Sequence, residues 1–519
     1  MPELFWQTSL TVVRSCVGVS GMRKPVSLFI SGLFLAATLT ASADVRLPSL
    51  FSSNMVLQRS VSVSVWGWAD DGENVTVKFR NQKVSTKAKQ GKWSLKLSSL
   101  KAGGPDVFTV SGKNSIELTN VLVGEVWICS GQSNMEWPLK SSFAPEADIA
   151  ASSNSMLRLL VVPKKKANEP IDEFKSKWQE ANPTTTPGFS AVGYYFGRDL
   201  QKSLGVPVGL IQSDWGGSPA EVWMKQDVLE SNPRYKTEIL DAYEPAKKSY
   251  EEALAKYEKE KAEDKSGKPK PAPYAPWKPT ELYNGMIAPL ISYTIKGAIW
   301  YQGESNAGRA HQYRSLFPDM IRNWRRDWNQ GDFTFLAVQL APFQAIKNQP
   351  AESAWAELRE AQLYTTTVLP KTGVAVITDV GDEKDIHPNK KAPVGVRLAL
   401  AARGVAYDEK IVYSGPIYKK MRVKGDKAIL SFDHVGSGLE ARGGALKGFA
   451  ICGADKKFVW AVAEIDDDKI VVSSPNVSEP VAVRFGWADF PVVNLWNKDG
   501  LPASPFRTDN FPMTTAPKE

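Results

Sequence analysis

The sequence predicts an α/β domain over about 121–408, flanked on both sides by β-rich regions. Three observations support this fold class. Short alternating apolar runs fill residues 44–120, nearly continuous apolar runs separated by helical patterns fill the central region, and alternating runs return over 409–519. Alternation is typical of strands with one buried face, whereas continuous apolar runs are typical of strands covered on both faces.

The N-terminal β-rich region is predicted over residues 44–120. Its alternating runs are separated by turn clusters such as Asp70-Asp71-Gly72, and this regular spacing is typical of a small sandwich. The runs are Val61–Trp66, Val75–Phe79 and Trp93–Leu97.

The pattern changes at Val121, where strands and helices begin to alternate, as in a parallel sheet. The predicted strands are Val121–Cys129, Val206–Ile211, Ile295–Trp300, Phe333–Gln339 and Val374–Ile377. The predicted helices are Val192–Leu204, Gln312–Trp328 and Ala354–Thr367. An insert over 245–278 interrupts this rhythm, with an exposed helix rich in Lys and Glu followed by a Pro-rich stretch.

The C-terminal region, 409–519, is predicted to be β-rich. Its strand-like runs are Ala428–Phe432, Phe449–Cys452, Lys457–Ala461, Ile470–Val472 and Ala482–Phe485.

Residues 1–43 are predicted to form a signal peptide, with Met22 as an alternative start. Arg23-Lys24 precedes an apolar run from Val26 to Thr38, and a small-x-small cleavage pattern ends at Ala43. The run is too short to favour a membrane anchor, so no membrane span is expected after cleavage. The chain is therefore predicted to be secreted or periplasmic.

Composition excludes several classes of protein. Hydrophobic residues make up 43% and charged residues 23%, which is ordinary globular usage. The net charge is +8, but Lys and Arg are scattered, so no nucleic-acid partner is predicted. The three cysteines cannot form a disulfide framework, and Cys129 and Cys452, both in apolar runs, are expected to be buried free thiols.

Histidine restricts the possible chemistry, because a serine nucleophile needs a base and the chain has three histidines. His387 follows a predicted sheet strand and an acidic loop, where open α/β sheets carry their sites. Asp385 is the nearest acid that could orient it, with Asp382 and Asp379 behind. The alternative is a surface histidine in a polar loop. His311 and His434 are expected to be structural or on the surface.

Ser133 follows the strand that ends at Cys129, and Gly131 permits a tight turn before it. Residues from Met135 onward can open a helix whose first amides face a developing anion. The alternative is an ordinary helix N-cap. Gly216 and the block from Gln302 to Asn306 also follow predicted strands, and their N–H groups are candidate oxyanion donors. Together these segments supply a nucleophile, a base, an acid and oxyanion donors.

Four segments resemble the sialate O-acetylesterase family of the SGNH hydrolases: Gly131–Pro138, Trp215–Gly217, Trp300–Asn306 and Asp385–Pro388. The similarity runs from about Leu47 to Thr508, with the motifs in order. It implies a flavodoxin-like, three-layer hydrolase domain and deacetylation of O-acetylated sugars through an acetyl-enzyme, with no metal or other cofactor.

The resemblance also implies roles for individual residues. Ser133 takes the place of the nucleophile and His387 that of the base, and the amides of Ser133 and Gly216 face the oxyanion. Lys384 stands where the superfamily often has its Asp, so Asp385 or Asp382 is the acid of a triad, with a Ser-His dyad as the alternative. Ser305 stands where the third block usually has Asn, so Asn306 or Gln302 is the third donor. Trp300 and Glu304 are predicted to bind substrate.

Three functions are weighed. A carbohydrate O-acetylesterase is favoured, acting on sialic acid or, as the alternative, on acetylated xylan or another polysaccharide. A non-catalytic glycan-binding protein would have broken motifs, whereas Ser133 and His387 are both present. A sulfatase-like or metal hydrolase needs a ligand cluster, and three widely spaced histidines do not supply one. The oligomeric state is not predicted.

Overall fold

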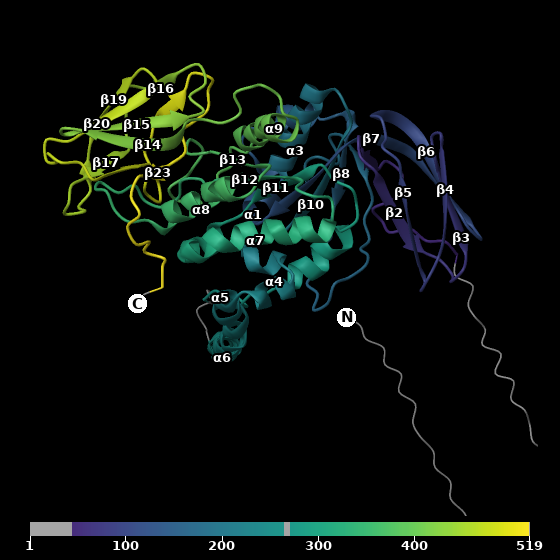
Figure 1. Ribbon diagram of the computed structural model, residues 1–519. Helices are drawn as coiled ribbons and strands as arrows, with labels where there is room; N and C mark the ends of the chain where they lie inside the picture. Colours follow the sequence, from purple (N-terminus) through teal and green to yellow (C-terminus); the bar gives the residue numbers. More distant parts are fainter. Residues whose placement is uncertain (1–43, 264–269, 518–519) are drawn as a thin grey trace, which may run out of the picture. The chain divides into compact units, whose positions relative to one another are not determined.

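The computed structural model describes residues 44–263 and 270–517 (Figure 1). The predicted signal peptide, 1–43, and its alternative start at Met22 lie outside the described residues, as do residues 264–269 of the predicted insert. Within the described ranges, no helix combines the length and hydropathy needed to cross a membrane.

Alternating burial builds the N-terminal β-rich region. In β2 (Val63–Trp68) every second side chain is buried, and the strand pairs in antiparallel fashion with β5 (Lys92–Leu97). A second antiparallel set contains β3 (Asn74–Phe79), β4 (Gln82–Lys87) and β6 (Gly103–Ser111). Their inward residues form one apolar core.

One strand, β7 (Ser115–Gly131), joins this region to the central sheet. Its first half pairs with β6; up to Gly131 it then pairs in parallel with one central strand from Glu125 and with another, on its other side, from Trp127. β1 (Val56–Gln58) pairs in parallel with it around Val123. The predicted boundary between residues 120 and 121 therefore falls inside a continuous strand.

The central sheet is mixed and mostly parallel, which confirms the α/β class. Its order is β13 (Thr372–Ala375), β12 (Thr334–Val338), β11 (Gly297–Tyr301), β7, β10 (Val208–Asp214), β8 (Asn154–Val161) and β9 (Gln179–Ala181). Neighbours are parallel except β8 and β9. The sequence did not predict β8, because Arg158 interrupts its apolar run; the buried guanidinium donates to Asn120 Oδ1 at 3.1 Å.

Helices cover both faces of this sheet (Figure 1): α3 (Ala191–Leu204) and α9 (Ala392–Ala406) on one, and α7 (Ala310–Trp328) and α8 (Ala354–Val368) on the other. Successive strand residues alternate between the two cores. Ile299 lies in the core with α3 and α9, and its neighbour Trp300 lies in the opposite core with α7 and α8. Burial on both faces explains the continuous apolar runs of these strands.

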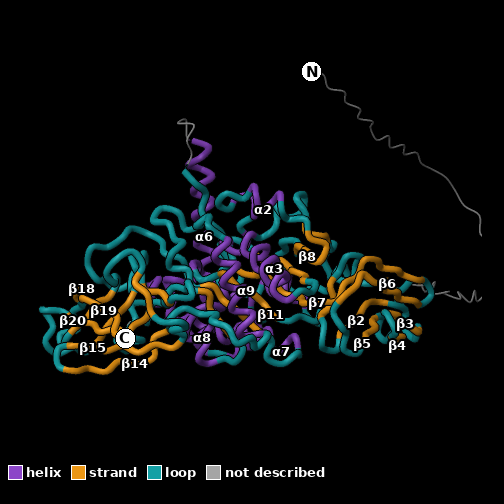
Figure 2. Tube along the Cα trace, turned by 90° about the horizontal axis from the view of Figure 1, so that it is seen from above, coloured by secondary structure: helices purple, strands orange, loops and turns teal. Residues whose placement is uncertain are grey.

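The predicted insert contains α6 (Asp241–Glu263), whose side chains are all at least partly exposed. Pro245 stands at its fifth position. Figure 2 shows α6 leading away from the strands toward the residues that are not described. The shorter helices are α2 (Glu146–Ala150), α4 (Gln226–Ser231) and α5 (Pro233–Tyr235).

The C-terminal region is β-rich, as predicted. One sheet has the order β14 (Ile417–Lys424), β15 (Lys427–Asp433), β20 (Lys469–Ser473) and β19 (Val462–Asp466). Another has the order β18 (Val459–Trp460), β17 (Phe449–Cys452), β21 (Ala482–Phe485) and β23 (Phe506–Arg507). A short pair joins β16 (Leu439–Ala441) and β22 (Leu495–Asn497). Residues of all three sheets form a separate apolar core.

Candidate active site

Ser133 lies at the turn where β7 leaves the centre of the sheet. It is the first residue of α1 (Ser133–Glu136), which is a single turn. Gly131, just before the turn, has a φ of 140°, and a Cβ there would lie 2.1 Å from the carbonyl oxygen of Tyr301. Only glycine fits this approach. Because α1 has one turn, it offers the N–H groups at its start rather than a sizeable helix dipole.

His387 reaches Ser133 from the loop between β13 and α9. Its Nε2 lies 2.8 Å from Ser133 Oγ, across 254 residues of sequence. The imidazole also stacks on Trp137, with ring centroids 5.4 Å apart and planes 18° apart. His311 lies on α7 and His434 follows β15. The structure thus brings together the serine and the histidine that the sequence singled out.

One carboxylate contacts Nδ1 of His387, the ring nitrogen that does not face Ser133. Asp385 Oδ1 lies 3.3 Å from His387 Nδ1 and also accepts the His387 backbone N–H at 2.8 Å. The side chain of Asp382 turns to the backbone instead, where its Oδ1 accepts the N–H groups of Lys384 and Asp385. Asp379 pairs with Arg397. Of the three acids weighed from the sequence, Asp385 is the one in contact with the ring.

The surroundings of His387 favour its neutral form. Burial lowers the pKa of His387 below its usual value near 6.5; Asp385 opposes this by raising the pKa, and Lys391 lowers it. A neutral imidazole can take a proton from Ser133 at neutral pH.

Behind Ser133 lies a buried polar network that sequence reasoning missed. Asn134 Nδ2 donates to Glu304 Oε1 at 2.6 Å and to the carbonyl oxygen of Ile386 at 3.0 Å. The buried Lys391 donates to Asn134 Oδ1, and burial lowers the pKa of Lys391 to about 7. The network ties the nucleophile turn to the histidine loop. Asn134 stands beside Ser133 in the motif, but nothing in the sequence around Lys391 indicates its burial.

Glu304, which the sequence predicts to bind substrate, is a member of this network. It supports Asn134 from behind, and burial raises the pKa of its carboxyl group. The expectation that Trp300 binds substrate is wrong. Its side chain is fully buried and packs against Trp223, Phe317 and Trp324 in the core with α7. Its strand is covered on both faces, so an aromatic residue near the strand end faces a core rather than the surroundings of Ser133.

The predicted oxyanion donor Gly216 lies beside the nucleophile. A Cβ on Gly216 would lie 3.2 Å from Ser133 Cβ. However, the Gly216 N–H donates to Glu136 Oε2 at 2.7 Å, and Glu136 Oε1 pairs with Lys164 Nζ at 2.5 Å. The amide that is expected to hold the oxyanion is thus occupied by a carboxylate of the same chain.

Gln302 and Asn306 are both buried, and both amides already have protein partners. Gln302 Nε2 donates to Asn306 Oδ1 at 2.6 Å and to the carbonyl oxygen of Ser218 at 3.3 Å. Asn306 Nδ2 donates to Glu221 Oε2 at 2.9 Å, and its Oδ1 accepts the N–H of Ala220. These side chains bond to the loop over 218–221, and within the described ranges neither forms a hydrogen bond with Ser133; the role of third oxyanion donor stays a prediction for both.

A second buried acid lies at the end of β10. Burial raises the pKa of Asp214 to about 8, so this carboxyl group is largely protonated at neutral pH. Its Oδ1 accepts from Gln212 Nε2 at 3.1 Å, while Oδ2 has no hydrogen-bond partner among the described residues. Asp214 pairs in register with Gly131 and so lies in the strand beside the nucleophile turn.

Among the described residues, no group of three or more His, Cys, Asp or Glu side chains is placed to hold a metal ion. Cys129 and Cys452 are buried free thiols, as the apolar runs around them predicted.

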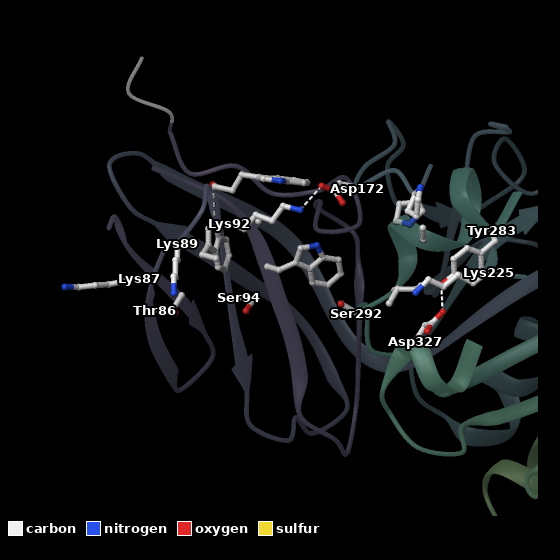
Figure 3. A pocket seen from close by; sticks show the side chains of 18 residues that line it. Thr86, Lys87, Lys89, Lys92, Ser94, Asp172, Lys225, Tyr283, Ser292 and Asp327 are labelled. Carbon is white, nitrogen blue, oxygen red and sulfur yellow. Dashed lines mark hydrogen bonds and ion pairs between the residues drawn. The ribbon is translucent and has the colours of Figure 1, made fainter. Parts of the chain in front are cut away.

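A cavity of about 750 Å³ lies away from this site (Figure 3). Residues of the N-terminal strands line one side, and Tyr283 and Asp327 line the other. Its polar groups are partly paired, since Lys92 bonds to Asp172 at 2.8 Å and the Tyr283 hydroxyl donates to Asp327. Neither Ser133 nor His387 lines it. We therefore place the candidate active site by the contact between those two residues rather than by the size of a cavity.

Comparison with known families gives a match over most of the central region. The family described as carbohydrate esterase, sialic acid-specific acetylesterase matches residues 123–266 and 272–403. These segments contain Ser133, Gly216 and His387.

Individual proteins match over nearly the whole chain. The sialate O-acetylesterases of Homo sapiens and Pongo abelii are each 29% identical, over 91% of this chain and 94% of theirs. A carbohydrate acetylesterase of known structure from Xanthomonas citri is 42% identical, with a TM-score of 0.79 over 90% of this chain and 100% of that one.

Proposed function

Because the chain belongs to the carbohydrate esterase family of sialic acid-specific acetylesterases, we propose that it hydrolyses acetyl esters on sugars with Ser133 as the nucleophile. The chain is an esterase of the serine hydrolase type. The observation that carries the proposal is the 2.8 Å contact between Ser133 Oγ and His387 Nε2 at the carboxyl ends of the central strands.

In the proposed reaction, His387 Nε2 takes the proton of Ser133 Oγ as this oxygen attacks the carbonyl carbon of the acetyl ester. The tetrahedral intermediate collapses, and the sugar hydroxyl leaves with the proton from His387. The acetyl group is then bonded to Ser133 Oγ. A water molecule gives one proton to His387 and attacks this ester. His387 returns that proton to Ser133 Oγ, and the acetic acid that leaves ionises to acetate. Asp385 supports the imidazolium that forms twice in the cycle.

The proposed oxyanion donors are the backbone N–H groups of Ser133 and Gly216. Gly216 can serve only after Glu136 has moved from its amide, because one N–H cannot donate fully to both groups. We therefore include displacement of the Glu136 carboxylate as a step that precedes or accompanies attack.

The proposal extends to the domain, its location and its substrate. It takes residues 121–408 as a flavodoxin-like, three-layer SGNH hydrolase domain. It places the mature protein outside the cytoplasm, secreted or periplasmic, on the basis of the leader pattern that ends at Ala43. The substrate is an O-acetylated carbohydrate, either sialic acid or a polysaccharide such as acetylated xylan.

The test of the mechanism is acetate release from p-nitrophenyl acetate. Ser133→Ala and His387→Ala should each lower kcat by at least about 10³-fold, because each removes a member of a unit that acts together. His434→Asn is the matched control, since Asn tolerates the φ of 59° at this position, and it should keep wild-type activity. Thermal unfolding of all variants checks the fold. Near wild-type turnover in Ser133→Ala or His387→Ala would contradict the proposed mechanism.

The sugar is identified by a separate measurement. Acetate release is compared between 9-O-acetylated sialic acid and acetylated xylan, with Ser133→Ala as the blank for each. Release from neither, with activity on p-nitrophenyl acetate, would mean that the esterase acts on another acetyl ester.

A further inference from the structure

Beside the nucleophile turn lie two partly exposed tryptophans from distant parts of the sequence. Trp215 follows β10, and Trp277 lies in the Pro-rich stretch that follows α6. Their ring centroids are 5.5 Å apart with planes at 87°. Trp277 Nε1 lies 4.0 Å from where a Cβ of Gly217 would be, and a Cβ on the adjacent Gly216 would lie 3.2 Å from Ser133 Cβ. The tryptophan pair, Trp215 and Trp277, therefore stands next to the reacting serine.

The structure holds Trp277 firmly in this position. The residues that follow it pack along the segment over 164–168, where Lys278 Nζ donates to Asn168 Oδ1 at 2.7 Å and the Ala167 N–H donates to the carbonyl oxygen of Glu281 at 3.1 Å. Lys166 Nζ lies 4.1 Å from the centre of the Trp277 ring. These contacts hold the aromatic side chain of Trp277, from the Pro-rich stretch, beside the candidate active site.

The indole N–H groups of the tryptophan pair are available to a ligand, whereas the lysines beside the pair already form ion pairs with carboxylates. Neither indole N–H has a hydrogen-bond acceptor among the described residues, whereas the indole of Trp137 close by donates to the carbonyl oxygen of Ser141 at 2.8 Å. Lys164 pairs with Glu136, and Lys166 pairs with Glu281 at 2.9 Å. Lys166 lies over the Trp277 ring, and both Lys164 and Lys166 lie over the Trp215 ring. The ring surface beside these cations and the N–H donors suit a pyranose ring and its hydroxyl groups. Because both lysines have carboxylate partners, the pair is better suited to an uncharged sugar than to an anionic one.

We propose that the tryptophan pair is a subsite for an uncharged pyranose unit next to the acetylated sugar, so that the enzyme recognises an oligosaccharide or polysaccharide rather than a single sugar. This inference rests on the proposed esterase function and gives Trp277, near the end of the predicted insert, a role in substrate binding. The acetylated unit lies at Ser133, and the neighbouring unit contacts Trp277.

The test uses two substrates that differ in their need for the subsite. Acetylated xylohexaose reaches the pair, whereas p-nitrophenyl acetate occupies only the surroundings of Ser133. Trp277→Ala should raise KM for acetylated xylohexaose so that kcat/KM falls about fivefold to tenfold, the loss of one aromatic stacking contact. It should leave kcat/KM for p-nitrophenyl acetate within about twofold of wild type.

Two further variants serve as controls. Trp277→Phe keeps a ring and should recover most of the activity on acetylated xylohexaose. Tyr274→Ala removes a 93% exposed aromatic side chain from the same Pro-rich stretch and should change neither activity. Equal losses on both substrates in Trp277→Ala would reduce Trp277 to a structural role, and unchanged kcat/KM for acetylated xylohexaose would also overturn the subsite. A wild-type protein without activity on p-nitrophenyl acetate would instead refute the esterase mechanism itself.

Discussion

Replacing Asp385 with Asn should slow the enzyme only modestly, by at most about fivefold in kcat. The Asp385 side chain is 57% exposed, and its Oδ1 lies 3.3 Å from His387 Nδ1, beyond the 2.7–2.9 Å typical of strong charge-assisted hydrogen bonds. Exposed ion pairs contribute about 0.2–1 kcal/mol, and 1.4 kcal/mol corresponds to tenfold. A buried triad acid, in contrast, contributes about 10⁴-fold.

The pH dependence gives the same variant a second, independent readout. The charge of Asp385 raises the pKa of His387, so its removal should lower that pKa further. The acidic limb of kcat, measured on p-nitrophenyl acetate from pH 4.5 to 8, should therefore move to lower pH in Asp385→Asn. Asp382→Asn is the comparison, because its amide oxygen can still accept the two backbone N–H groups of the loop. A loss of 10³-fold or more, or an acidic limb that moves to higher pH, would refute this reasoning.

Two other predictions concern carboxyl groups around the nucleophile turn. Glu136→Ala frees the Gly216 N–H from a charge-assisted bond of about 1.5 kcal/mol, so kcat/KM on p-nitrophenyl acetate should rise by up to about tenfold; a slower enzyme would show that Glu136 does not compete with the oxyanion. Asp214→Asn should change the pH dependence of stability. The folded-state pKa of about 8 is above the unfolded value of 3.8, so wild type loses stability as pH rises from about 4 to 8, by about 4 kcal/mol at pH 7. Urea unfolding at pH 5 and pH 8 should show the variant gaining on wild type at the higher pH, and an equal difference at both values would contradict the assignment.

Much of the central fold could be predicted because strands buried on both faces of a sheet have continuous apolar runs in the sequence. The strands around Ile211 and Ile299 agree with the prediction to within three residues, and the strand around Ile128 begins six residues earlier than predicted. Continuous apolar runs of this length are typical of strands buried on both faces. β8 was missed because a buried Arg158 breaks its pattern, and its partner Asn120 lies on a different strand. A buried charge is compensated by its tertiary neighbours, and those cannot be read locally.

The candidate site divides in the same way. Ser133 and His387 could be paired from sequence because histidine is scarce and both residues follow central strands. The partners of amide and carboxylate side chains could not be predicted. Asn306 bonds to the 218–221 loop and Glu136 bonds to Gly216, contacts that depend on how segments 80 or more residues apart meet. The sequence does not show which face of the sheet Trp300 points to. When both faces of a strand are buried, its residues are all apolar, and no alternation of polar and apolar residues marks the two faces.

The continuity of β7 limits which truncations and domain exchanges this protein can tolerate. Its chain runs without a break from the N-terminal sheet to Gly131, two residues before the nucleophile, and Gln58 of β1 bonds both to Glu125 and to the Val126 N–H. In a truncated enzyme that starts at residue 121, the first residues of the strand that leads to Ser133 would lose their hydrogen-bonding partners in β1 and β6. The N-terminal region is therefore not an independent domain that can be exchanged or deleted without affecting the catalytic centre. Any shuffling of this architecture has to move both together.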